Sequence, residues 1–182
     1  MSKRAIIAVD IQNEYFPGGK LPLVGIEKAA ANAARVIEHG RRANDQIIHF
    51  RHEFPDPQAP FFNPGTDGVE TNPAVAPLAS ETVIVKNYPN SFLETGLKET
   101  LDSQGVEEVV IIGAMSHMCI DATSRAASDL GYKTTIVQDA CATRDLEFDG
   151  VTVPAGQVHA TIMAALVFAY GTVTTTKEFL TQ

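Results

Sequence analysis

A cysteine that follows a strongly apolar run is the most chemically suggestive feature of this sequence. Residues 109–112 are four consecutive β-branched residues, which is typical of an interior strand of a parallel sheet because both of its faces are covered. From Cys119 to Leu130, apolar residues recur at helical spacing, and Gly131 follows where a helix would end. The pattern predicts a strand that leads through a turn into a helix with Cys119 in its first turn.

The first turn of a helix is a favourable place for an ionised thiol. Unpaired backbone N–H groups and the positive end of the helix dipole favour a thiolate over a thiol there, and Ser116 is positioned to cap such a helix. A thiolate at Cys119 could attack a carbonyl carbon. The alternative is that Cys119 is a small buried apolar side chain, which is the commoner role of a cysteine in an Ala-rich helix.

Two other reactive side chains end predicted strands. Asp10 follows the apolar run 5–9, and Lys86 follows residues 82–85. Because the carboxyl ends of parallel strands share one edge of a sheet, we expect Asp10, Lys86 and Cys119 to meet there. A carboxylate can accept the thiol proton, and an ammonium group can stabilise the resulting thiolate. The three residue types together predict a cysteine nucleophile with a base and an electrostatic partner.

Strand and helix patterns alternate along the whole chain. Strands are predicted over 5–9, 46–51, 82–85, 109–112, 134–137 and 172–175, and helices over 26–44, near 97–101, from Cys119 and over 157–169. This alternation predicts a doubly wound α/β fold, a three-layer α/β/α sandwich around a parallel sheet. We expect residues 1–182 to form a single domain.

Two long segments have no sustained hydrophobic period. Residues 53–80 contain six of the ten prolines, and residues 140–156 contain Cys141. Long irregular segments in a compact domain are usually functional, so we expect these two to shape a substrate pocket. The phenylalanines at positions 54, 61 and 62 could line that pocket, but anchoring the loop to the body is the expected role. Cys141 has no recognisable base near it and is expected to be structural.

The composition narrows the classes of partner. The chain has 22 acidic and 14 basic residues, a net charge of -8, and no basic cluster longer than Arg41-Arg42. This balance disfavours nucleic acid and anionic membranes as partners and leaves a small-molecule substrate. The sequence shows neither the apolar core of a signal peptide nor an apolar run of about 18 residues. We therefore expect a cytoplasmic protein with two free thiols.

The three motifs resemble those of the isochorismatase-like cysteine hydrolases, a superfamily that includes nicotinamidases and N-carbamoylsarcosine amidohydrolases. Residues 10–13 (Asp-Ile-Gln-Asn) resemble the family's opening motif, Lys86 its strand-end lysine, and residues 113–123 its cysteine motif. The resemblance implies that Asp10, Lys86 and Cys119 form a catalytic triad. It also implies a Rossmann-like sheet of six parallel strands in the order 3-2-1-4-5-6.

The same resemblance implies further details of the site. The Ala114–Met115 peptide bond should be cis, and the backbone N–H groups of Met115 and Cys119 should form an oxyanion hole. We also expect a homodimer or homotetramer. Substrate contacts are expected from Gln12, Phe16, Ala114 and His117, which lie in or near the motifs, and from Phe62 in the segment 53–80.

One departure from the family pattern bears on metal binding. Nicotinamidases carry an Asp-x-His metal motif after the second strand, whereas residues 49–52 here read His-Phe-Arg-His. Two histidines without a carboxylate are a poor metal site, and His49 and His52 need not converge. We therefore predict that the protein uses no metal or other cofactor, and nicotinamide is disfavoured as its substrate.

The cysteine itself favours one reaction over another. True isochorismatases replace this cysteine, so Cys119 argues against vinyl-ether cleavage and for attack on a carbonyl carbon. The predicted reaction is hydrolysis of a non-peptide C–N bond, in an amide, a ureide or an N-carbamoyl group, through a thioester intermediate.

Two other classes of function are alternatives to hydrolysis. Asp10, Lys86 and Asp139 faintly resemble the Mg²⁺-dependent haloacid-dehalogenase phosphotransferases, but Gln12 stands where their second Asp is required. The other alternative is a non-catalytic ligand-binding or scaffold protein on the same fold. No Gly-x-Gly-x-x-Gly follows the first strand to bind phosphate, and a binding module would not need three reactive side chains.

Overall fold

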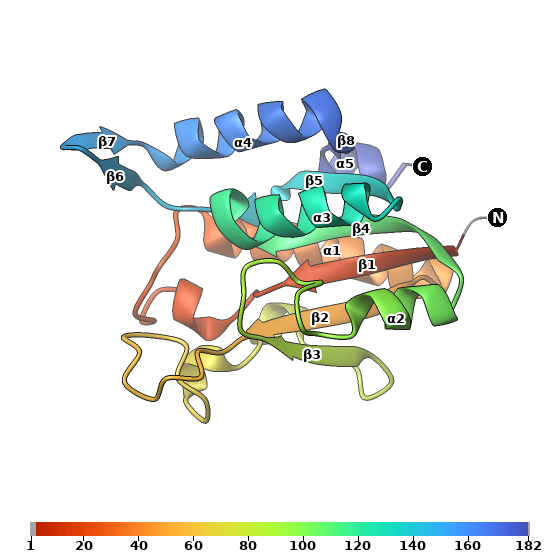
Figure 1. Cartoon of the computed structure of the whole chain (residues 1–182), viewed down its shortest axis with the longest axis horizontal. Coiled ribbons are helices and arrows are strands. Elements are labelled where there is room, and N and C mark those ends of the chain that lie inside the picture. Colours follow the sequence, from red (N-terminus) through yellow and green to blue (C-terminus); the bar gives the residue numbers. More distant parts are fainter. Residues whose placement is uncertain (1–2, 182) are drawn as a thin grey trace.

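The computed structural model describes residues 3–181 and shows a central sheet of six parallel strands (Figure 1). The strands are β1 (Lys3–Val9), β2 (Gln46–His52), β3 (Thr82–Lys86), β4 (Val106–Ala114), β5 (Lys133–Ala142) and β8 (Thr172–Thr174). Their order is β3-β2-β1-β4-β5-β8. Since β8 is the sixth strand of this sheet along the chain, the predicted order 3-2-1-4-5-6 is confirmed.

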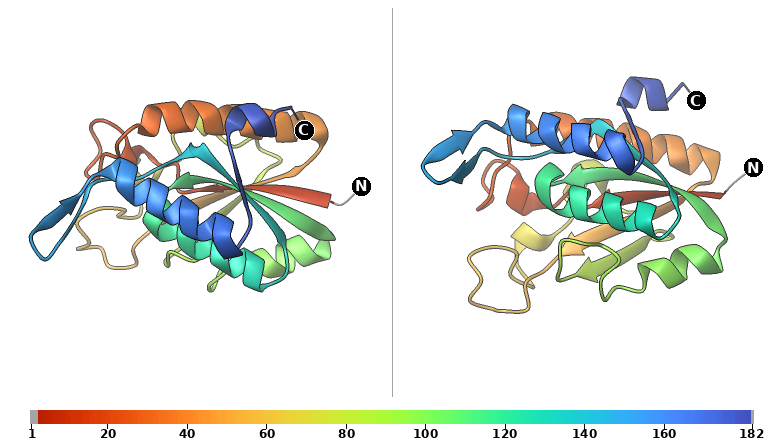
Figure 2. Two further views of the ribbon diagram at one scale, coloured as in Figure 1. Left: turned by 90° about the horizontal axis from the view of Figure 1, so that it is seen from above. Right: turned by 45° about the horizontal axis from the view of Figure 1, so that its top comes forward.

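Helices cover both faces of the sheet and complete the predicted three-layer sandwich (Figure 2). The helices α1 (Ile26–Ala43) and α5 (Thr176–Phe179) lie on one face. The other face is covered by α2 (Leu97–Ser103), α3 (Asp121–Asp129) and α4 (Ala155–Ala169). No helix within residues 3–181 is long and apolar enough to cross a membrane.

Burial of the sheet on both faces explains the apolar runs that mark its central strands. In β1, Ile6 and Ala8 pack with the α1 side while Ile7 and Val9 pack with the α2 and α3 side. Successive side chains of a strand point to opposite faces, so a strand covered twice is apolar at every position. Strands β1 and β4 are neighbours, which places their carboxyl ends side by side.

The second irregular segment is more ordered than its sequence suggested. Strand β5 continues to Ala142, so Cys141 lies in the strand rather than in a loop. The strands β6 (Leu146–Phe148) and β7 (Val151–Val153) then form an antiparallel hairpin, so the expectation of a loop over 140–156 was wrong. The turn residues Asp149 and Gly150 both have positive φ, and an Asp-Gly pair is the usual signature of such a hairpin.

The first irregular segment is held against the body by aromatic side chains. It contains two short 3₁₀ turns, Asp67–Val69 and Pro73–Val75. Phe62 is 2% exposed and packs edge-on against Tyr15, with ring centroids 5.1 Å apart. Phe54 and Phe61 pack against the same cluster. The anchoring role expected of these phenylalanines is confirmed.

A glycine permits the close approach of β4 to β1 at the edge of the sheet where both strands end. Gly113 has a φ of +125°, and a Cβ atom there would lie 1.9 Å from the carbonyl oxygen of Val9. Asp10 follows Val9 directly, so this contact also fixes where the Asp10 side chain begins. A side chain at position 113 would force the two strands apart.

Replacing Gly113 with Ala is therefore expected to lower the free energy of unfolding by about 2 to 3 kcal/mol. Gly105→Ala is the matched control, because Gly105 also has a positive φ but a Cβ there would meet nothing within 4 Å. The control should lose only the conformational part, about 1 kcal/mol. Urea denaturation measures both, and equal midpoints for the two variants would contradict the steric argument.

Candidate active site

Three reactive side chains from distant parts of the chain meet at the carboxyl edge of the sheet, at the left in Figure 1. Asp10 follows β1, Lys86 ends β3, and Cys119 lies in a short π-helical segment between β4 and α3, here called the cysteine turn (Ser116–Ile120). The Lys86 Nζ atom is 2.7 Å from Asp10 Oδ2 and 3.3 Å from Cys119 Sγ. The structure thus brings together the three residues predicted to meet.

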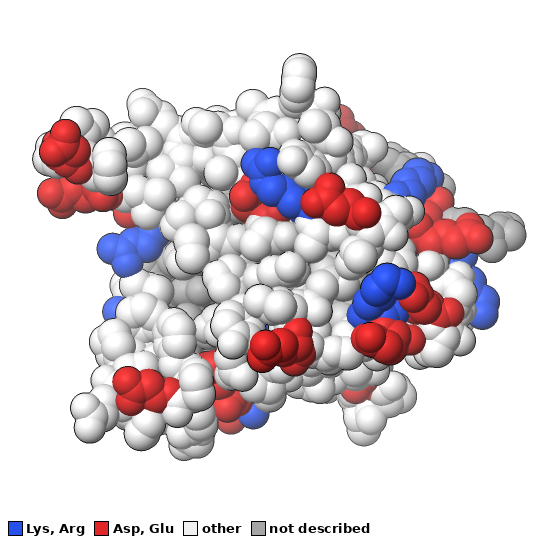
Figure 3. Space-filling view, viewed as in Figure 1, with Lys and Arg blue, Asp and Glu red and all other residues white. Residues whose placement is uncertain are grey.

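This Asp10–Lys86–Cys119 cluster is shielded from solvent. The side chains of Asp10 and Lys86 are 0% exposed, and Cys119 is 5% exposed. In Figure 3 the molecular surface is hollowed on the side of the carboxyl edge. A buried ion pair at 2.7 Å interacts strongly because water does not screen it, so the positions of these charges are tightly coupled.

Lys86 has two further partners that were not expected. Its Nζ atom lies 3.1 Å from His52 Nδ1 and donates to the carbonyl oxygen of Tyr88 at 3.0 Å. His52 ends β2 and is directly opposite Lys86 in the parallel register of β2 and β3. From the sequence His52 was considered only as a candidate metal ligand, and that role was rejected. Its contact with Lys86 could not be foreseen, because the register between two strands is not visible in either strand alone.

Burial and neighbouring charges determine the protonation of Lys86. Burial alone would lower the pKa of Lys86, but the negative charge of Asp10 and the contact with Cys119 outweigh it and raise the pKa. Lys86 is therefore a stable ammonium group within the cluster.

The Cys119 thiol is protonated, whereas the sequence predicted a thiolate. Burial raises the pKa of the Cys119 thiol, the negative charge of Asp10 raises it further, and Lys86 lowers it by less. The expectation that a helix start would favour the thiolate was wrong, because desolvation exceeds the effect of the backbone dipoles in a buried turn. At rest Cys119 is therefore a neutral thiol, and its sulfur lies within 4.8 Å of an Asp10 carboxylate oxygen.

Side chains fix the cysteine turn to β5 and α4. The hydroxyl of Ser116 lies 2.8 Å from His159 Nδ1 and 3.3 Å from the carbonyl oxygen of Ala142. His117 Nδ1 lies 2.6 Å from the hydroxyl of Thr143. The prediction that Ser116 caps the helix was wrong, since its hydroxyl makes these tertiary contacts and no side chain caps the turn.

The backbone before the turn has the geometry that the family resemblance implied. The Ala114–Met115 peptide bond is cis, which confirms that expectation. Ala114 itself is fully buried at the end of β4. The oxyanion hole from the N–H groups of Met115 and Cys119 stays a prediction.

Gln12, Phe62 and Phe16, which were expected to contact substrate, all contact other parts of the protein. Gln12 donates to the carbonyl oxygens of His52 at 3.0 Å and Val69 at 2.8 Å, and its own oxygen accepts from the His52 amide at 2.9 Å. Both N–H groups of its side chain are thus bound to backbone. Phe62 is buried beside His52, and Phe16 is partly buried against the core.

The histidines do not assemble a metal site. His49 Nε2 lies 3.0 Å from Glu81 Oε2, and Glu81 is paired with Arg41 at 2.7 Å. His52 lies in the reactive cluster instead, so the two histidines do not converge. Potential ligand atoms of Asp10, His52 and Cys119 lie within 4.8 Å of one another, but the charged Lys86 already lies among them. These residues therefore do not fit a bound metal ion while Lys86 keeps its proton.

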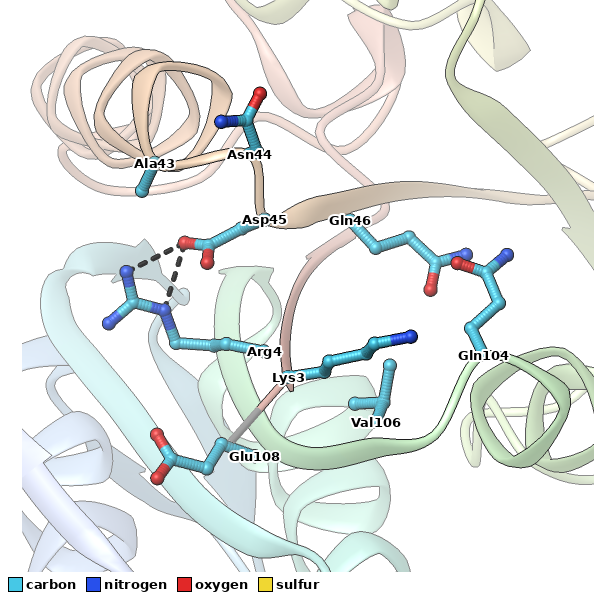
Figure 4. Close-up of a pocket in the computed structure, with 9 residues that line it drawn as sticks. All are labelled: Lys3, Arg4, Ala43, Asn44, Asp45, Gln46, Gln104, Val106 and Glu108. Carbon is cyan, nitrogen blue, oxygen red and sulfur yellow. Dashed lines mark hydrogen bonds and ion pairs between the residues drawn. The ribbon is translucent and has the colours of Figure 1, made fainter. Parts of the chain in front are cut away.

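A large cavity lies at the opposite edge of the sheet (Figure 4). It has a volume of about 710 Å³ and is lined by residues at the amino ends of β1, β2 and β4, including Lys3, Gln46 and Val106. Arg4 and Asp45 form an ion pair of 2.7 Å beside it. No cysteine lines this cavity, and its Arg4 and Asp45 side chains are paired with each other, so the reactive cluster is the better candidate.

Comparisons with known proteins show the family to which the chain belongs. A family model described as "Isochorismatase domain" matches residues 4–178. The chain is 49% identical to an uncharacterized isochorismatase family protein, YddQ of Bacillus subtilis, over 97% of this chain and 98% of that protein. It is 31% identical to a maleamate amidohydrolase of Pseudomonas putida, over 78% and 73% of the two chains. An isochorismatase structure from Pseudomonas putida superposes with a TM-score of 0.90 and 38% identity, covering 96% and 89%.

Removing the charge of Lys86 should make the thiol harder to ionise. Lys86→Met keeps the length of the side chain and deletes the one group that lowers the pKa of Cys119. We expect alkylation of Cys119 by iodoacetamide at pH 8 to slow about tenfold or more, the equivalent of at least one pKa unit. Lys133→Met, at an exposed lysine paired with Glu108, is the control. Equal rates in the parent protein and Lys86→Met would show that Lys86 does not stabilise the thiolate.

The metal prediction has a direct test. Dialysis against EDTA should leave both the alkylation rate of Cys119 and the melting temperature unchanged, because the candidate ligands already bind Lys86 or Glu81. If either property changes on dialysis and Zn²⁺ or Fe²⁺ restores it, the protein has a metal site that this geometry does not reveal.

Proposed function

The chain belongs to the isochorismatase family of hydrolases, and we propose that it hydrolyses a non-peptide C–N bond of a small molecule with Cys119 as nucleophile. The observation that carries this proposal is the position of Lys86, whose Nζ atom contacts both Asp10 at 2.7 Å and Cys119 at 3.3 Å. One fixed positive charge thus contacts both a potential base and a potential nucleophile, which lie within 4.8 Å of each other.

The first half of the reaction forms a thioester. The Cys119 thiol transfers its proton to the Asp10 carboxylate as the sulfur attacks the substrate carbonyl carbon. Negative charge moves to the carbonyl oxygen, where the N–H groups of Met115 and Cys119 are the proposed donors. The neutral Asp10 carboxyl then protonates the leaving nitrogen as the C–N bond breaks. Ammonia or an amine departs, and the acyl group stays on sulfur.

The second half of the reaction releases the acid. Asp10, again a carboxylate, accepts a proton from water as the water oxygen attacks the thioester carbonyl. The C–S bond breaks, and the sulfur leaves as a thiolate that Lys86 stabilises and Asp10 reprotonates. The sum is one amide bond and one water converted to a carboxylic acid and an amine, or to a carbamic acid where the substrate is a ureide.

The substrate class follows from the nucleophile and from burial. Attack by sulfur requires an electrophilic carbonyl carbon, so amides, ureides and N-carbamoyl compounds are the proposed substrates. Cys119 is 5% exposed, which favours a small acyl group over a polymer. The maleamate amidohydrolase relative is by its name an enzyme for a small amide.

A non-catalytic binding protein explains the same residues less well. Burying an ion pair and a thiol requires desolvation that their mutual attraction only partly offsets. A binding module with this fold could place apolar side chains there without that cost. The buried cluster is expected where chemistry requires it.

The two cysteines should differ completely in function. Cys141 is buried, burial raises the pKa of its thiol to about 12, and the thiol donates to the carbonyl oxygen of Val137. Cys119→Ala should abolish ammonia release from a panel of small primary amides, ureides and N-carbamoyl acids, a loss of about 1000-fold or more. Cys141→Ala should keep most of the activity. Turnover by Cys119→Ala would refute the proposed nucleophile.

A further inference from the structure

The β6–β7 hairpin has one apolar side and one polar side. Side chains alternate along each strand, and the apolar ones pair with one another across the hairpin, so they share one side. They are Leu146, Phe148, Val151 and Val153. The opposite side carries Glu147 and Thr152. Phe148 is 84% exposed and Val151 is 62% exposed, so the apolar side is largely open to solvent.

A hairpin of this kind needs another element to cover it. It forms a two-stranded sheet of its own, separate from the six-stranded sheet. It projects beyond the amino end of α4 and away from the body of the molecule (Figure 1, Figure 2). A two-stranded hairpin is only marginally stable in water unless its apolar side packs against something. Within residues 3–181, the exposure of Phe148 and Val151 shows that no element does so.

Helix α4 presents a second uncovered apolar surface. Its sequence contains no Asp, Glu, Lys or Arg, and its inward side chains Met163 and Leu166 are buried in the core. The outward side chains recur at helical spacing and are exposed, and we call them the outer α4 face: Ala160, Ala164, Val167 and Phe168. Phe168 is 90% exposed. A helix that is apolar on all sides is normally buried on all sides.

The outer α4 face can meet a copy of itself without electrostatic repulsion. The chain has a net charge of -8, so two copies repel each other over most of their surface. Over α4, however, the surface is white in Figure 3. On the adjoining α3, Arg125 is paired with Asp121 at 2.9 Å and lies over the ring of Tyr170 at 4.5 Å. These two opposite charges cancel locally, which leaves the face suited to a second copy.

The two uncovered surfaces lie at opposite ends of α4. The helix has 15 residues and is about 22 Å long, with the hairpin at its amino end and Phe168 in its last turn. Only Pro154 separates β7 from α4, so the hairpin cannot fold back over Phe168 of its own chain. Where two α4 helices lie antiparallel about a two-fold axis, each hairpin lies beside the carboxyl end of the other α4.

We propose that the outer α4 face and the apolar side of the β6–β7 hairpin form a reciprocal interface with a second copy of this chain. The two α4 helices pack antiparallel about a two-fold axis, and the hairpin of each copy covers Phe168 of the partner subunit. Ala160 and Ala164 lie in the middle of the contact, where small side chains let two helices approach closely. Such a symmetric contact covers both surfaces in both copies.

The surface is large enough for a stable dimer. With the hairpin, α4 extends over about 30 Å, and with the adjoining α3 the face is about 20 Å wide. Its flat projection is therefore roughly 600 Å², and the accessible area is larger because side chains protrude. A stable interface buries about 800 Å² on each partner.

The interface lies on the outside of the helix that holds the cysteine turn. His159 of α4 contacts the hydroxyl of Ser116 at 2.8 Å on the inner side. A second copy that fixes α4 from outside therefore also supports the turn that carries Cys119.

The test measures mass by light scattering during size-exclusion chromatography in reducing buffer. The parent protein should have at least twice the mass of one chain. Phe168→Glu and Phe148→Lys each place one unpaired charge in the interface, and each should halve the mass of the parent. The double variant Phe148→Lys/Phe168→Glu brings opposite charges together across the interface and should recover it. Val83→Glu is the matched control, because Val83 is 45% exposed on the edge strand β3 and should keep the mass of the parent.

Loss of folding does not confuse this test, because Phe148 and Phe168 protrude from the body. Circular dichroism establishes that each variant is folded, and Ala164→Glu repeats the test at a second position of the outer α4 face.

Several results would overturn the proposal. A monomeric parent protein would show that α4 faces solvent or a different protein. The interface is also misplaced if Phe168→Glu and Phe148→Lys keep the mass of the parent, or if Val83→Glu halves it as well. If both single variants dissociate and the double variant does not reassociate, the hairpin does not cover Phe168 of the partner subunit, and the reciprocal arrangement is wrong.

Discussion

The ion pair between Lys86 and Asp10 is the interaction on which the arrangement of this edge depends. Both side chains are fully buried, and a buried charge is tolerated only when a partner of opposite charge is close to it. That requirement fixes the ends of three strands relative to one another, because Asp10 follows β1, Lys86 ends β3, and His52 ends β2 between them. Gly113 adds the fourth strand by allowing β4 to approach β1 closely.

The same ion pair explains how a neutral thiol can serve as a nucleophile. At rest the cluster holds one negative carboxylate, one positive ammonium and one neutral thiol. When the thiol proton moves to Asp10, the carboxyl becomes neutral and the sulfur negative, so the net buried charge is unchanged. Ionisation into bulk water would instead leave an additional buried charge, which is why burial raises the pKa of Cys119. Proton transfer within the cluster avoids that cost.

Features that depend on a short stretch of sequence could be predicted, whereas contacts between distant stretches could not. The meeting of Asp10, Lys86 and Cys119 could be predicted because each lies at or just beyond the carboxyl end of an apolar strand, and parallel strands end at one edge. The contact between His52 and Lys86 depends on the register of β2 against β3, and neither strand's own pattern encodes that register. The tertiary bonds of Ser116 were invisible for the same reason. The β6–β7 hairpin had a local signal in Asp149-Gly150, but each of its strands is only three residues long, too short to show a clear alternation.

The segment 53–80 lies beside the Asp10–Lys86–Cys119 cluster, and the same side chains contact both this segment and His52. The Gln12 side chain joins the backbone of His52 to Val69 in that segment, and Phe62 packs on both His52 and Tyr15. A substitution in residues 53–80 that moves Phe62 or Val69 is therefore expected to move the imidazole that contacts Lys86 as well. The side chains that anchor the segment therefore also hold the imidazole that contacts Lys86.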